Sequence, residues 1–169
     1  MTNRIFLILQ IIVLAVVVPC FNGGAVAWGE SPREQLKQMV ELLQKTPTDN
    51  ALRERIIKLA QELKPAPAVP EEAERRMMRG AAALEGVKSV AGYKEAAREF
   101  EQATLVAPWY GDAYFNLGVA QDKAEDYEAA LRNLKLALLA LPNDKEIKAL
   151  IFKVEYRKGK ADSPDEQYQ

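Results

Sequence analysis

Residues 111–142 read GDAYFNLGVAQDKAEDYEAALRNLKLALLALP, and this stretch decides the fold. Apolar and small residues recur in it at helical spacing, first from Tyr114 to Gly118 and again from Ala130 to Ala137, with a polar turn between the two runs. Small residues let two helical backbones approach closely, while larger side chains fill the space around the contact. The stretch therefore predicts a hairpin of two helices whose apolar faces meet.

The second half of this pattern recurs earlier in the chain at a constant offset. The residues that match at this offset are Tyr93 with Tyr127, Ala96 with Ala130, Ala103 with Ala137 and Pro108 with Pro142. A single helical hairpin cannot bury both of its faces, so recurrence at a fixed period is typical of stacked repeats. The first helix of the earlier repeat keeps apolar spacing over residues 77–84, and residues 86–92 are expected to form a small loop insertion.

The Leu117–Gly118 pair and the closing Pro142 complete a pattern that resembles the tetratricopeptide repeat. The resemblance implies an all-α fold, a right-handed solenoid of helical hairpins. It predicts one repeat over residues 71–108, a second over 109–142 and a capping helix over 143–158 that covers the end of the stack.

Another helical hairpin is expected before the repeats, over residues 28–63. It opens with a capping box at residues 31–34, with proline at the first helical position, and it resembles a degenerate repeat. The proline-rich residues 64–70 predict an extended spacer between this hairpin and the repeats. Residues 159–169 are small, polar and charged, which predicts a disordered tail.

Residues 1–27 contain the parts of an export signal. Arg4 precedes a nearly unbroken apolar run over residues 5–18, and a small-x-small motif ends at Ala27. The run is shorter than the roughly 20 residues of a membrane span, and cleavage after Ala27 is the main interpretation. An uncleaved membrane anchor and a lipid on Cys20 stay open as alternatives. The expected location is the periplasm or the cell envelope.

The composition argues against catalysis and against nucleic-acid binding. The chain has no histidine, which removes the commonest acid–base group and a frequent metal ligand. Its formal net charge is -1, and its interspersed charges offer no basic patch for nucleic acid or for an anionic membrane. The close acidic pairs, Glu71 with Glu72 and Asp122 with Asp126, are expected to be helix caps and surface charges. A non-catalytic protein without cofactor or metal is predicted.

The family resemblance implies a groove for a protein partner, lined by the first helix of each repeat. The positions that it carries onto this chain are Met78, Ala82, Phe115, Val119, Phe152 and Tyr156 on the floor, with Asp112, Asp122 and Lys123 on the rim. The apolar residues at Phe115 and Val119 favour an apolar helix or an extended peptide as ligand. The alternative is that these side chains pack on the terminal helix or on the N-terminal hairpin, which would leave no open groove.

A second apolar surface is expected on the convex side of the repeats. Leu136 and Leu139 fall on the outer face of a second helix, and Leu105 is the counterpart of Leu139 one repeat earlier. The favoured interpretation is that the N-terminal hairpin covers this stripe; the alternative is a homo-oligomer within an envelope assembly. Trp109 and Tyr110, at the junction of the repeats, are expected to wedge between helices.

Overall fold

The computed structural model describes residues 31–163, so the predicted export signal over residues 1–27 and the last residues of the predicted tail lie outside the described part. The described chain consists of α-helices joined by loops and contains no strand. The helices are α1 (Pro32–Lys45), α2 (Asn50–Glu62), α3 (Glu71–Leu84), α4 (Val90–Val106), α5 (Gly111–Lys123), α6 (Tyr127–Ala140) and α7 (Lys145–Asp162). The predicted all-α fold class is confirmed.

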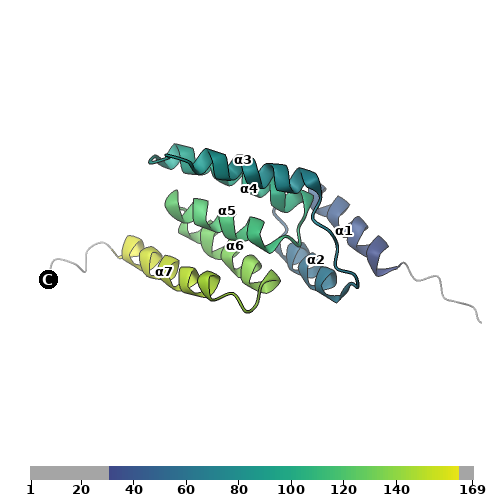
Figure 1. Ribbon diagram of the computed structural model, residues 1–169. Coiled ribbons are helices and arrows are strands. Elements are labelled where there is room, and N and C mark those ends of the chain that lie inside the picture. The colour runs from purple at the N-terminus through teal and green to yellow at the C-terminus, as the bar shows by residue number, and fades with distance from the viewer. Residues whose placement is uncertain (1–30, 164–169) are drawn as a thin grey trace, which may run out of the picture.

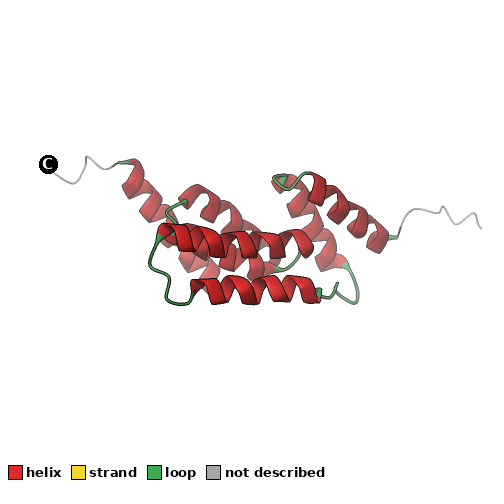
Figure 2. Cartoon of the chain, turned by 90° about the horizontal axis from the view of Figure 1, so that it is seen from above, coloured by secondary structure: helices red, strands yellow, loops and turns green. Residues whose placement is uncertain are grey.

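The helices from α3 onward stack in chain order. α3 packs on α4, α4 on α5, α5 on α6 and α6 on α7. Figure 1 shows this order from the α3–α4 pair at the top to α7 at the bottom, with α1 and α2 at one side. Figure 2 shows the same stack from above. The arrangement is a helical-repeat solenoid, as the resemblance predicts.

Two glycines set how closely the helices of each pair approach. A Cβ atom on Gly80 would lie 2.5 Å from Phe100 Cε1, and one on Gly118 would lie 2.7 Å from Leu134 Cγ. Both separations are too short for a real Cβ atom, so glycine is what allows α3 to meet α4 and α5 to meet α6. Gly80 is therefore the structural counterpart of Gly118.

The glycine counterparts show where the first repeat is longer than the second. The sequence offset from Gly80 to Gly118 is larger than the offset between the residues that they face, Phe100 and Leu134. The predicted loop over residues 86–92 is only partly a loop, because α4 already begins at Val90. The Ser89 hydroxyl caps it by accepting a hydrogen bond from the Gly92 N–H at 3.2 Å. The insertion thus lengthens both the turn and the start of α4.

The N-terminal hairpin lies against the second helices of the stack. α2 packs on α6, and α1 contacts α4. Ile57 of α2 belongs to the same buried cluster as Tyr114 and Leu136, and Leu105 and Trp109 pack against the cluster that α1 and α2 form. Leu136 is only 4% exposed as a result. The hairpin therefore covers most of the convex stripe.

The helix ends follow local signals, with one correction at the C-terminus. Ser31 Oγ accepts a hydrogen bond from the Glu34 N–H at 3.2 Å, as the capping box predicts. The sequence predicts that the last helix stops near residue 158, but α7 continues to Asp162. Lys158 Nζ lies 2.7 Å from Asp162 Oδ2, and an ion pair at this spacing supports the last helical turn.

Candidate functional site

The first helices of the stack, α3, α5 and α7, contain the predicted groove positions. Phe115 and Val119 of α5 are half-buried, and Ala82 of α3 is exposed. Met78 of α3 keeps 65% of its surface exposed. These residues lie on separate helices of the same stack, so they can contribute to one surface although they are far apart in the sequence.

The correspondence of Gly80 with Gly118 places the groove positions on α3 one residue earlier than the sequence predicts. Because Gly80 corresponds to Gly118, the α3 counterparts of Phe115 and Val119 are Met77 and Ala81. Each lies one residue earlier than predicted, since the period alone does not locate the insertion between α3 and α4. Met77 is half-buried, and Ala81 is exposed.

Phe115 is only partly available to a ligand. It packs against two buried clusters, one of which contains Ile147 and the other Val154, both from α7. This is the contact with the terminal helix that the sequence left open as an alternative to a free groove. Phe115 nevertheless remains half-buried, so α7 does not cover it completely.

Two of the three predicted rim residues are exposed, but the third is buried, so its prediction as a rim residue is wrong. Asp112 and Lys123, near the two ends of α5, are exposed. Asp122 is only 5% exposed and forms an ion pair with Arg157 of α7. The hydrogen bond with Asp122 raises the pKa of Arg157. Since α7 stacks directly on this part of the hairpin, Asp122 helps to hold α7 in place instead of facing a ligand.

Two large aromatic side chains of α7 are exposed, Phe152 by 73% and Tyr156 by 63%. Phe152 follows Gly118 by one repeat period, which places it at the position that faces the second helix of its own hairpin. In the described part of the chain no second helix follows α7, so Phe152 points to the end of the stack and not into the groove. Lys160 Nζ lies 5.5 Å from the centre of the Tyr156 ring.

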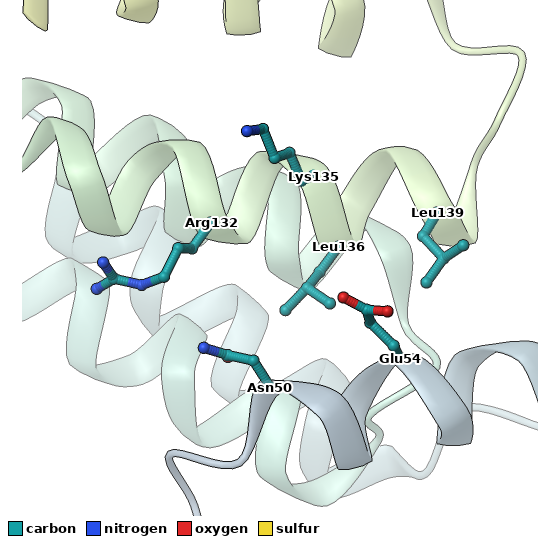
Figure 3. A pocket seen from close by; sticks show the side chains of 6 residues that line it. All are labelled: Asn50, Glu54, Arg132, Lys135, Leu136 and Leu139. Carbon is teal, nitrogen blue, oxygen red and sulfur yellow. The ribbon is translucent and has the colours of Figure 1, made fainter.

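A cleft of about 300 Å³ lies between α2 and α6 (Figure 3). It is lined by Asn50 and Glu54 of α2 and by Arg132, Lys135, Leu136 and Leu139 of α6. Figure 3 shows the two leucines pointing from α6 toward α2. Leu139 remains half-buried, so it is the part of the stripe that is open to this cleft.

A buried arginine joins the N-terminal hairpin to the stack beside this cleft. Arg53 is 5% exposed, and its Nη1 donates to Thr104 Oγ1 and to the Tyr114 hydroxyl, each at 3.0 Å. Its Nη2 donates to the carbonyl oxygen of Pro47 at 2.8 Å. Burial raises the pKa of Tyr114, although the nearby arginine opposes this shift. Arg53 is not among the residues predicted from the sequence, although its position on the same helical stripe as Ile57 indicates a buried side chain.

Comparison with known proteins finds a family match for part of the stack. Residues 93–153 match the tetratricopeptide-repeat family, from α4 to the middle of α7. No curated protein matches the chain. In the range 31–163, no group of three or more Cys, Asp and Glu side chains is placed to hold a metal ion. None of the helices described is long and apolar enough to cross a membrane.

Proposed function

We propose that the chain is a tetratricopeptide-repeat protein, as the match over residues 93–153 supports, and that it binds a segment of another protein along the face formed by α3, α5 and α7. Tetratricopeptide repeats generally mediate contacts between proteins, and the family is generally non-catalytic. The observation that carries the proposal is the half-buried apolar pair Phe115 and Val119 on α5, with Ala81 exposed at the position of α3 that corresponds to Val119.

The chemistry of this face suggests what the bound segment looks like. Phe115 and Val119 provide apolar contact area in the middle of α5, and the small side chain of Ala81 leaves room for a ligand. A helix or an extended peptide binds such a groove through a few apolar anchor residues. Asp112 and Lys123 place opposite charges near the two ends of α5, which would orient the segment. We expect an apolar ligand centre, a cation toward Asp112 and an anion toward Lys123.

Site-specific photo-crosslinking in the producing cells tests this proposal. A photoreactive phenylalanine analogue replaces Ala81 or Val119 in the full chain, with matched controls at the exposed Glu95 of α4 and Arg55 of α2. We expect one partner to be crosslinked from both groove positions and from neither control. Equal crosslinking from the control positions, or none from the groove, would overturn the proposed binding face.

We also propose that the protein acts outside the cytoplasm, in the periplasm or at the cell envelope. The support is the sequence of residues 1–27, with its basic start, apolar run and small-x-small motif. Intact-mass analysis of the protein isolated from its cells gives a direct test, and a chain that begins at Trp28 is expected. Retention of residues 1–27 would indicate a membrane anchor, and an added lipid mass with a chain beginning at Cys20 would indicate a lipoprotein.

A further inference from the structure

Within residues 31–163, no further helix covers the outer face of α3 or of α7, the helices at the two edges of the stack. Figure 1 shows α3 along one edge and α7 along the opposite edge. α1 and α2 lie against α4 and α6, so they do not continue the stack beyond α3. Each edge helix therefore presents an outer face that the next helix of a longer array would cover.

The outer face of α7 is apolar and cationic. Phe152 and Tyr156 are 73% and 63% exposed on it, one helical turn apart, and Ala149 is exposed beside them. Four exposed lysines lie around these residues by helical spacing, Lys145, Lys148, Lys153 and Lys160. Glu146 and Glu155, at the borders of the same face, offset only part of this positive charge.

The outer face of α3 has the opposite character. Met78 is 65% exposed, and Ala82 one turn later is exposed as well, so the centre of the face is apolar. Three glutamates are exposed on the same side of the helix, Glu71, Glu74 and Glu85. Arg75 balances Glu71 through an ion pair of 2.9 Å, and the face keeps a negative net charge even with Arg79 at its border.

We propose that α7 of one copy docks on α3 of a second copy of this chain. The lysines of α7 then meet the glutamates of α3, and the raised rings of Phe152 and Tyr156 pack onto Met78 and Ala82. Pairing two α7 faces, or two α3 faces, would instead bring like charges together. Each copy carries one face of each kind, so the contact is head-to-tail and the assembly can grow in steps.

Sedimentation velocity of the chain as isolated from its cells tests this pairing without any partner protein, so its outcome is independent of the proposed groove. The average sedimentation coefficient is expected to rise with protein concentration. The rise is expected to be smaller at about 0.5 M than at about 0.05 M salt, because salt screens the charges at the edges of the contact. A chain that stays monomeric at every concentration overturns the proposal.

Charge reversal identifies the two faces. One variant carries Lys145→Glu with Lys148→Glu on α7, and the other carries Glu74→Lys with Glu85→Lys on α3. Each variant alone should associate at least about tenfold more weakly than the parent, because its two end faces now carry the same sign of charge. An equimolar mixture should recover the association, since each reversed face then meets one of opposite charge.

Matched controls separate this contact from other forms of association. Lys64→Glu with Lys94→Glu reverses two exposed lysines away from both edges and should change nothing. Phe152→Ala should weaken association while circular dichroism shows unchanged helix content. Association that survives both reversals, or a mixture that fails to recover, overturns the proposed pairing of α7 with α3.

Discussion

At the scale of single residues, the joint between the N-terminal hairpin and the stack depends on a buried cation. The partners of Arg53 in the described structure are two hydroxyl groups and a carbonyl oxygen. Hydrogen bonds that involve a charged group contribute more to stability than those between neutral groups. Removing the guanidinium would also leave the Tyr114 hydroxyl without this partner inside the protein.

Replacing Arg53 should therefore destabilise the fold measurably. For Arg53→Met we expect a loss of about 2 kcal/mol in the free energy of unfolding, because three charge-assisted hydrogen bonds disappear while the apolar stem is retained. Urea unfolding followed by circular dichroism measures it. Arg55→Met, at an exposed position of the same helix, is the control and should change stability by less than about 0.5 kcal/mol. Equal effects of the two substitutions would show that the hydrogen bonds of Arg53 are not important.

The glycines of the stack give a second prediction at this scale. Gly118→Ala should destabilise the protein by about 1 kcal/mol, because the steric cost against the fully buried Leu134 exceeds the gain in helix propensity. Gly159→Ala is the matched control, since no atom other than those of its own helix backbone and its two chain neighbours lies within 4 Å of the added Cβ. That substitution should stabilise α7 by about 0.5 kcal/mol. Thermal unfolding of both variants measures these two stability changes. A stabilising Gly118→Ala would contradict the close approach of α5 and α6.

At the scale of elements, α7 packs on one end of the stack. Ile147 and Val154 attach it through buried apolar contacts, and the Asp122–Arg157 pair attaches it through charge. Asp122 is the buried member of this pair, so the loss of its partner would leave a carboxylate without its counter-ion. Phe115 packs against the same clusters as Ile147 and Val154, so loosening α7 would expose more of the Phe115 side chain.

Breaking the pair should loosen α7 more than any other helix. In Arg157→Gln, amide hydrogen exchange is expected to become faster across residues 145–162 and to stay unchanged in α3 and α4, because those helices lie away from the broken contact. Lys153→Gln, at an exposed position of the same helix, is the control. A uniform rise in exchange across all helices would instead indicate a general loss of stability.

At the scale of the whole molecule, much of the array was predictable from local patterns. The Leu117–Gly118 pair, the constant repeat period and the caps specify helices and their stacking, since each acts within one or two hairpins. The roles of Arg53 and Asp122 were not predictable from the sequence in this way. Arg53 meets Tyr114 from 61 residues away, and Asp122 meets Arg157 from 35, so both contacts depend on how separate elements dock.

The docked hairpin should protect the stack from exposing apolar surface. Ile57→Asp places a charge in the cluster that holds Leu136, and we expect the hairpin to detach and the binding of an apolar fluorescent dye to rise several-fold. Lys58→Asp, next to it on the exposed side of α2, is the control and should leave dye binding unchanged. No increase with Ile57→Asp, while circular dichroism shows retained helices, would contradict the covering role of the hairpin.

The proposed binding face can be tested most directly by amide hydrogen exchange of the protein alone and in the presence of the partner that photo-crosslinking identifies. Binding along the first helices predicts slower exchange in α3, α5 and α7, with little change in α2 and α6. Protection concentrated in α2 and α6 would contradict this, and would place the partner instead in the cleft lined by Asn50, Glu54 and Leu139.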